Sequence, residues 1–287
     1  MMGGTISLSP AFQGGTITNL ISGGGLNGDY TVSGTLTLGN GDANGTLTIE
    51  SGAIFNWNNG NVGGVVLSNN ATLNWAGGTL LTHLDIMAGA AVNWSGGAAG
   101  SYVNVEAGGE LNLAGGTVYL NDVLTNAGTV AWLSGNVVAQ NNGSSLKGAV
   151  ENAGGGLWNI QCDQSLYDNY GNGAPYFHNA GTVVKANSTG TTTISIPFNN
   201  AGTVVVQTGT INFNAGGIME SSFTVGAGAK IYFSGGAFSY GTVPSLSGAG
   251  SIQFTGGTLT LLDDVIPGLQ MMGGTISLSP AFQGGTI

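Results

Sequence analysis

Carboxylates are the residues from which this sequence could build a hydrolytic site. Cleavage of a glycosidic bond needs two facing carboxylates, usually with a basic residue nearby to stabilise an anion. The chain has 13 Asp and Glu, but only 3 Lys and no Arg. Its one adjacent acidic pair is Asp263–Asp264, and neighbours on a strand point to opposite faces. Other acids are scattered through the repeating pattern described below: Asp29, Asp42, Glu50, Asp85, Glu106 and Glu110. We therefore predict no catalytic residues and no enzymatic activity.

Metal ligands and nucleophiles are equally sparse. His83 and His178 are 95 residues apart and have no zinc-ligand spacing. The single Cys162 excludes a disulfide framework and has no recognisable partner group for nucleophilic catalysis. No EF-hand or calcium-binding nonapeptide surrounds the remaining candidate acids, Asp163, Asp168 and Asp263–Asp264. We predict no metal and no cofactor.

The one stretch with a concentration of binding residues is 159–178. It interrupts the repeating pattern, and its composition predicts a lateral loop. Such a loop could bind glycan or a partner chain through its acids, tyrosines and histidine: Asp163, Tyr167, Asp168, Tyr170, Tyr176 and His178.

The overall composition excludes several classes of partner. The formal net charge is -10, which argues against nucleic acid and against anionic membrane surfaces, because both are bound by Lys and Arg clusters. No apolar run approaches the roughly 20 residues of a membrane helix. Hydrophobic residues still make up 41% and there are 55 glycines, which indicates a chain with ample core material and many turns.

A residue triplet that repeats through the first half of the chain indicates the strands that must position these candidate residues. Its outer two residues are apolar, its middle residue is polar or small, and its last residues follow at steps of 18, 19, 19 and 19. This period-two alternation predicts strands with one buried face. A Gly pair or a close variant follows each triplet, as at Gly77–Gly78 and Gly96–Gly97, and allows a corner with positive φ. The triplets end at Trp57, Trp75, Trp94, Leu113 and Trp132.

Strand, corner and strand repeated at this spacing predict an all-β fold. We expect one continuous parallel β-helix (β-solenoid) over 1–287, with coils of about 19–23 residues and no clear end caps. Its cross-section stays open at this point.

Stacked coils should bring equivalent side chains into columns. We expect an interior core column at the triplet ends, extended by Trp158, and a similar column later at Phe213, Phe233 and Phe254. The middle residues Asn56, Asn74, Asn93 and Asn112 should form a ladder of amide hydrogen bonds on the opposite face.

The sequence also contains a long identical repeat. Met1–Ile17 returns letter for letter as Met271–Ile287, at an offset of 270 residues. This predicts one period of a tandem array plus the opening of the next; the alternative is an overlap added artificially at the end. The partners would be copies of the same chain joined end to end, either covalently or as stacked subunits.

Two phrases carry a family resemblance, Gly-Thr-Leu-Thr-Leu from Gly34 and Ala-Gly-Thr-Val-Val-Val-Gln-Thr-Gly-Thr-Ile-Asn-Phe from Ala201. They resemble the β-strand repeats of large bacterial secreted proteins, among them autotransporter passengers and filamentous-haemagglutinin-type adhesins. The resemblance implies a right-handed β-helix and an extracellular or cell-surface location. The predicted function is a structural unit of an extracellular filament, stalk or giant surface adhesin; the alternative is a module that binds surface glycans or a partner through the 163–178 loop.

Overall fold

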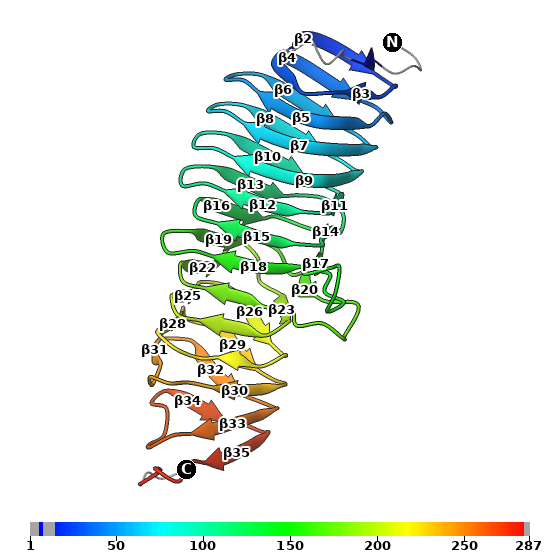
Figure 1. Cartoon of the computed structure of the whole chain (residues 1–287). Helices are drawn as coiled ribbons and strands as arrows, with labels where there is room; N and C mark the ends of the chain where they lie inside the picture. Colours follow the sequence, from blue (N-terminus) through cyan, green and yellow to red (C-terminus); the bar gives the residue numbers. More distant parts are fainter. Residues whose placement is uncertain (1–5, 8–14, 284–287) are drawn as a thin grey trace.

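The computed structural model describes residues 6–7 and 15–283, and all of its regular elements are β-strands (Figure 1). The strands stack in parallel as a β-solenoid of about 14 turns. Within the described residues there is no helix, and so none long and apolar enough to span a bilayer. The structure confirms the predicted all-β, parallel β-solenoid.

Most coils consist of three strands, which stack into three walls that we call A, B and C in chain order. Wall A contains β6 (Ile54–Trp57), β8 (Thr72–Trp75), β10 (Ala91–Trp94), β13 (Glu110–Leu113), β16 (Thr129–Trp132), β19 (Leu157–Ile160), β22 (Thr182–Lys185), β25 (Thr203–Val206), β28 (Ser222–Val225) and β31 (Ser245–Gly248). Wall B contains β11 (Gly97–Ala99), β14 (Val118–Leu120), β17 (Val137–Ala139), β20 (Ser165–Tyr167), β23 (Thr191–Ser195), β26 (Thr210–Phe213), β29 (Lys230–Phe233), β32 (Ser251–Phe254) and β34 (Leu269–Met271).

Wall C contains β12 (Tyr102–Val105), β15 (Val123–Asn126), β18 (Ala149–Asn152), β21 (Phe177–Asn179), β24 (Phe198–Asn200), β27 (Gly217–Ile218), β30 (Ala237–Ser239), β33 (Thr258–Leu261) and β35 (Thr275–Leu278). In the first coils some strands run through a corner without a break. β2 (Gly15–Ser22) and β4 (Tyr30–Leu38) span walls C and A, while β5 (Ala43–Ile49), β7 (Asn61–Leu67) and β9 (Thr79–Ile86) span walls B and C. The short strands β1 (Ile6–Ser7) and β3 (Leu26–Asn27) lie in wall B.

Alternation of apolar and polar residues fills the interior. In β8, Leu73 and Trp75 are fully buried, whereas Thr72 and Asn74 face outward and are partly exposed. The corner after it contains Gly78 at φ +86°. A Cβ there would strike the carbonyl oxygen of Gly60 in the preceding coil. Glycine is therefore required there both for the backbone conformation and for the close approach of the next coil.

Trp57, Trp75 and Trp94 of wall A stack face to face. Ring centroids are 4.6 Å apart for Trp57 and Trp75 and 4.3 Å apart for Trp75 and Trp94, close to the spacing of neighbouring strands. The indole N–H groups of these three tryptophans and of Trp132 are satisfied at the glycine corners; Trp94 Nε1 donates to the Gly96 carbonyl at 2.9 Å and Trp132 Nε1 to the Gly135 carbonyl at 2.7 Å. The tryptophan and the corner after it thus form one unit.

One detail of the predicted columns is different in the structure. Trp158 does not extend the tryptophan column, because it aligns with Val130, two residues before the triplet end. From there its indole nitrogen does not reach a corner carbonyl and is buried without a partner. Phe213, Phe233 and Phe254 are buried in register on wall B, where Phe213 stacks on Phe233 and Phe238 meets both Phe233 and Phe254 edge-on. The core residues therefore form two columns on two walls.

The outward asparagines form the expected ladder. Asn74 donates to Asn56 at 2.8 Å, Asn93 to Asn74 at 2.9 Å and Asn112 to Asn93 at 3.2 Å, each through side-chain amides. Stacked amides satisfy one another along the axis, where stacked carboxylates would repel. The low charge of the chain is compatible with this stacking.

The predicted lateral loop 159–178 is wrong in its bounds. β19 continues to Ile160, and β20 and β21 take up part of the range, because Ile160, Cys162, Leu166 and Phe177 contribute to the core. The protruding part is 168–176, and it lies beside a second excursion, 140–148, from the preceding coil. Both leave the solenoid between walls B and C, near β17 and β20 in Figure 1.

Candidate functional site

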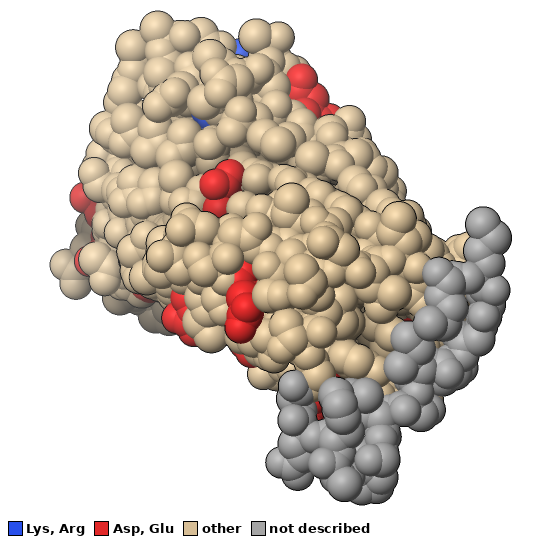
Figure 2. All heavy atoms as spheres, turned by 90° about the horizontal axis from the view of Figure 1, so that it is seen from above, with Lys and Arg blue, Asp and Glu red and all other residues tan. Residues whose placement is uncertain are grey.

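Among the described residues, no three His, Cys, Asp or Glu side chains gather closely enough to bind a metal ion. In the view of Figure 2 the acidic side chains form separate patches on a mostly uncharged surface. Three polar features do occur: a protruding pair of loops, a buried lysine site, and an open cavity beside the lysine site.

The six residues predicted to share one binding loop lie in four places. Asp168, Tyr170 and Tyr176 belong to the protruding loop or its base. Tyr167 is a part of β20, partly buried on wall B. His178 lies in β21, where its Nδ1 is 3.0 Å from Glu151 Oε2 on the strand below.

Asp163 is the remaining member, and it does not face the loop. Its carboxylate pairs with Lys185 at the corner between walls A and B. This corrects the prediction of a single cluster, and the reason is that Leu166 and Tyr167 between them are taken up by a wall strand.

The loop 168–176 is braced by the carboxylate of Asp168. Its Oδ1 accepts hydrogen bonds from the amides of Asn141 at 3.1 Å and Tyr170 at 3.2 Å, and its Oδ2 from the amide of Gly171 at 2.9 Å. Asn141 belongs to the second excursion, so the two loops hold one another. Tyr170 is left 48% exposed at the tip.

A cavity of about 330 Å³ lies at the base of these loops, which we call the loop cavity. Lys147 and Tyr176 offer a cation and a phenol at its rim. Burial and a hydrogen bond with Glu151 raise the pKa of Tyr176. These groups are suited to a hydroxyl-rich or acidic ligand. The lining is Val123, Asn141, Gly143, Lys147, Ala174 and Tyr176.

Lys185 occupies an unexpected place in the core. Its backbone pairs with Ile160, which in turn pairs with Trp132, so it stands where the coils below carry the tryptophan column. The side chain is fully buried. A buried ammonium is tolerated only when it is paired and fully hydrogen-bonded.

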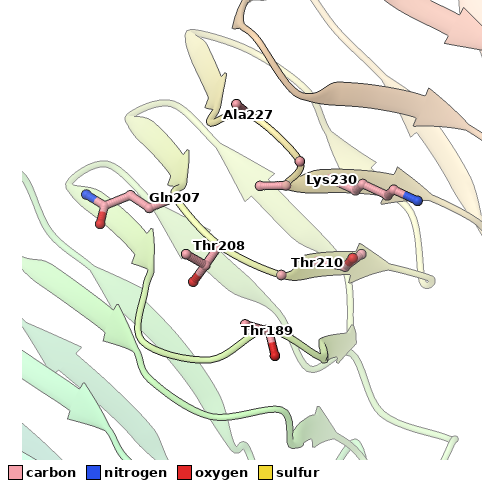
Figure 3. Close-up of a pocket in the computed structure, with 9 residues that line it drawn as sticks. Thr189, Gln207, Thr208, Thr210, Ala227 and Lys230 are labelled. Atoms are coloured by element: carbon pink, nitrogen blue, oxygen red, sulfur yellow. The ribbon is translucent and has the colours of Figure 1, made fainter.

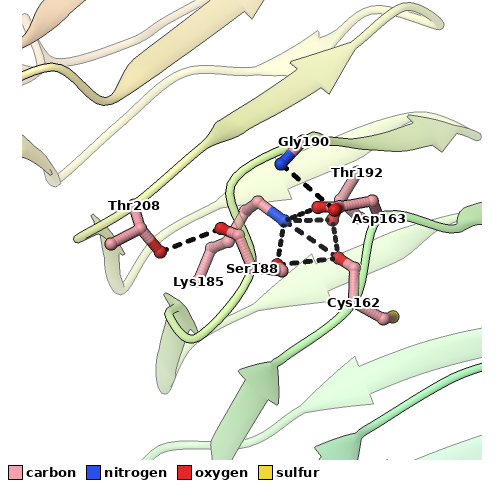
Figure 4. Close-up of polar contacts among 7 residues, drawn as sticks. All are labelled: Cys162, Asp163, Lys185, Ser188, Gly190, Thr192 and Thr208. Atoms are coloured by element: carbon pink, nitrogen blue, oxygen red, sulfur yellow. Dashed lines mark hydrogen bonds and ion pairs between the residues drawn. The ribbon is translucent and has the colours of Figure 1, made fainter.

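Four acceptors surround the ammonium at the corner (Figure 4). Lys185 Nζ lies 2.8 Å from Asp163 Oδ1, 2.9 Å from the Cys162 carbonyl, 2.7 Å from Ser188 Oγ and 2.8 Å from Thr192 Oγ1. Thr192 donates its own proton to the Cys162 carbonyl. All the buried donors of the lysine are thereby satisfied.

The site also alters the titration of its neighbours. Partial burial alone would raise the pKa of Asp163, but hydrogen bonds and charge from Lys185, with further bonds from Ser188 and the Gly190 amide, hold that pKa below its usual value. Burial raises the pKa of the Cys162 thiol to about 11. Cys162 is buried in the core, where the thiolate that a nucleophilic cysteine needs is disfavoured.

An open cavity of about 420 Å³ lies along the same edge between walls A and B, at the corners of this coil and of the next two (Figure 3). Thr208 on its rim donates to the Ser188 carbonyl at 2.9 Å, which connects it to the lysine site. Hydroxyls, an amide and one cation line it, without a carboxylate, so it has no general acid or base for hydrolysis. The lining is Thr189, Gln207, Thr208, Gly209, Thr210, Ala227, Gly228, Ala229 and Lys230.

Sequence reasoning missed two polar sets. Asn126, Asn152, Asn179 and Asn200 form a buried ladder at the corner between walls C and A, with 2.7 Å amide bonds between successive members. An Asn-Ala-Gly phrase that recurs at all four of these corners was the available signal. For Lys185, the signal was its alignment with the inward Val206 in the two Asn-Ala-Gly-Thr-Val-Val phrases.

The chain has no significant match to a protein family model, a curated protein or a solved structure. A functional conclusion therefore depends on the residues and geometry above.

Proposed function

We propose that this chain is a structural unit of an extracellular or cell-surface rod, in which the β-solenoid continues from one copy of the sequence into the next. The observation that carries the proposal is the identical segment Met1–Ile17 and Met271–Ile287. In both copies the described strand residues pair within the solenoid: β1 and the start of β2 in the first copy, and the end of β34 and β35 in the second. Residues 1–5 and 8–14 of the first copy and 284–287 of the second lie outside the described residues.

The C-terminal coil has features that favour a successor. Leu261 in β33 is fully buried, whereas Leu278, which pairs with it in β35, is 50% exposed and Met272 is 66% exposed. Among the described strands, β34 and β35 each pair with one neighbour only. A further coil would bury these side chains and satisfy the open parallel edge, which is otherwise an aggregation hazard.

The surface composition supports a role outside the cell. Three lysines and no arginine leave few sites for trypsin-like proteases, and backbone ladders run along the described part of the solenoid. The resemblance to bacterial surface β-helix proteins points the same way. The rod acts mechanically, as a stiff and weakly charged spacer.

The test is electron microscopy of the native material combined with its mass under denaturing conditions. One copy of about 14 turns should measure roughly 65 Å at about 4.8 Å per turn. Long rods with a denatured mass far above 28.5 kDa would show a tandem chain, and rods that fall to 28.5 kDa would show stacked subunits. Discrete particles of one copy at micromolar concentration would overturn the proposal.

A second candidate is binding of a glycan or partner chain at the loop cavity. The observation that favours it is a braced protrusion with Tyr170 exposed at its tip and Lys147 and Tyr176 at its base. Alanine at Tyr170 and Tyr176, with Tyr167→Ala on the wall as the matched control, tests it. Loss of glycan-array or cell binding in the first two variants, with rods intact, would support binding; equal binding in all three would exclude it.

A further inference from the structure

Equivalent residues in the two copies of the repeated segment lie on different walls. In the first copy the backbone of Ile6 pairs with Leu26 of β3, which belongs to wall B. In the second copy the equivalent Ile276 pairs with Leu259 of β33, which belongs to wall C. Along wall B, β34 lies thirteen coils after β1. The next strand of the chain, β35, lies one wall further on, in wall C.

The two placements are compatible with one continuous joint. In a tandem array, Ile287 is followed by Thr18 of the next copy. The segment Thr275–Leu278 then has Leu259 of its own copy below it and Leu26 of the following copy above it. Wall C of one copy thereby continues into wall B of the next.

We propose that successive copies in the rod are offset by one wall, a third of the circuit of a coil, so that three copies return to the same face. This inference rests on the proposed function and specifies the joint between copies. Because the walls follow one another in fixed order, wall B leads into wall A of the next copy and wall A leads into its wall C.

The offset has a consequence for the core. The phenylalanine column of wall B, Phe213, Phe233 and Phe254, ends at Met271. In the next copy that side of the rod becomes wall A, which carries Trp57, Trp75 and Trp94. The aromatic columns, which lie on two walls of a single copy, are brought onto the same side of the rod at each joint.

The offset also distributes the protruding loops. The 168–176 loop and its cavity lie on one side of a copy. Copies related by a third of a circuit display this loop on three sides of the rod in turn, about 64 Å apart along the axis at 4.8 Å per coil. A rod without the offset would carry all its loops along one edge, apart from the twist of the solenoid.

Cysteine pairs in a two-period chain test the offset. This chain runs through residue 287 and then continues with residues 18–287 of a second copy. Ser277 pairs with Thr260 below, and the pairing of Ser7 with Asn27 predicts Asn27 of the second copy above it. Paired parallel strands bring Cα atoms within disulfide range. Two variants are needed: Thr260→Cys with Ser277→Cys, and Ser277→Cys with Asn27→Cys in the second copy only.

Both pairs should oxidise at least about tenfold faster than a control pair, Gln253→Cys with Ser277→Cys, whose members lie on walls B and C. Peptide mass spectrometry identifies the bond, and the buried Cys162 stays in place. A segment placed on wall B at the joint would cross-link with Gln253→Cys and lose the Thr260→Cys bond. A segment on wall C followed by an in-phase copy would lose the Asn27→Cys bond. Either result overturns the offset.

Rod length separates this failure from failure of the proposed function. The reduced two-period chain should measure about twice the length of the single copy by electron microscopy. If the length doubles but either cross-link fails to form, the rod is supported and the offset is excluded. Two separate particles on one chain would exclude the rod itself.

Discussion

The same inward position of wall A is occupied in two different ways along the rod. In the coils of β6, β8, β10 and β16 it holds tryptophans that stack on one another or on Leu113 and bond the corner carbonyls. In the coil of β22 it holds Lys185, a fully buried cation bound by four oxygen acceptors. The coils share one backbone pattern but not one source of stability.

The difference shows what an inward position requires. A stacked aromatic ring gains from burial and from the ring above, so the arrangement propagates from coil to coil. A buried ion pair pays a desolvation cost that its attraction only roughly offsets, so it needs acceptors supplied by its own corner. We expect the tryptophan coils to stabilise the rod, and the Lys185 corner to specify how β20, β22 and β23 meet.

The largest effect should come from opening the tryptophan column. Trp94→Ala should lower the free energy of unfolding by about 3–5 kcal/mol, because it leaves a cavity between Trp75 and Leu113. Trp94→Phe, the matched control, keeps the ring and loses the N–H bond to Gly96, and should cost about 1–2 kcal/mol. Guanidinium unfolding followed by tryptophan fluorescence measures both. Equal costs for the two variants would contradict a stacking role.

At the contrasting corner, Asp163→Ala should cost about 2–3 kcal/mol. It leaves the ammonium of Lys185 buried with neutral acceptors only, although the 40% exposure of the Asp163 side chain reduces the penalty. Adding Lys185→Met should recover most of that loss, since a flexible apolar side chain replaces the unpaired charge. Denaturant unfolding of the single and double variants gives the coupling. A double variant less stable than Asp163→Ala would show that the lysine stabilises the core by itself.

The two asparagine ladders offer a smaller comparison. Asn152→Ala removes buried bonds to Asn126 and Asn179 and should cost about 1–3 kcal/mol. Asn93→Ala, in the outward ladder, should stay within about 0.5 kcal/mol because water replaces the lost amide. Local hydrogen exchange at the neighbouring coils locates each effect. Equal exchange in both variants would mean that burial does not distinguish the ladders.

The mildest probe is pH. The pKa of Asp163 is lowered in the folded state, so its contribution is present above the unfolded carboxyl pKa near 3.9 and is lost as the pH falls through the folded value. Unfolding free energy should therefore decline below about pH 4. The decline should be shallower in Lys185→Met, which removes the cause of the shift. Identical pH profiles for the two proteins would show that Asp163 does not contribute to the loss of stability at low pH.

Much of this architecture followed from local pattern. Alternation in triplets such as Leu73–Trp75 determined which side chains face inward, and the glycine pairs after them located the corners. The Asn56–Asn112 ladder followed from the same spacing, because residues one coil apart stack directly. These features depend only on period two and on the conformational freedom of glycine.

Only the tertiary structure decided which coil lies on which. Which residues of neighbouring coils stack on one another depends on how many residues the intervening corners contain. A change of a few residues in those corners therefore moves a side chain to another position or to another wall. This placed Lys185 above Ile160, moved Trp158 out of the tryptophan column and separated Asp163 from Tyr170. It also set identical sequences on walls B and C at the two ends. Sequence determined what each strand buries, and the cumulative path of the chain determined its neighbours.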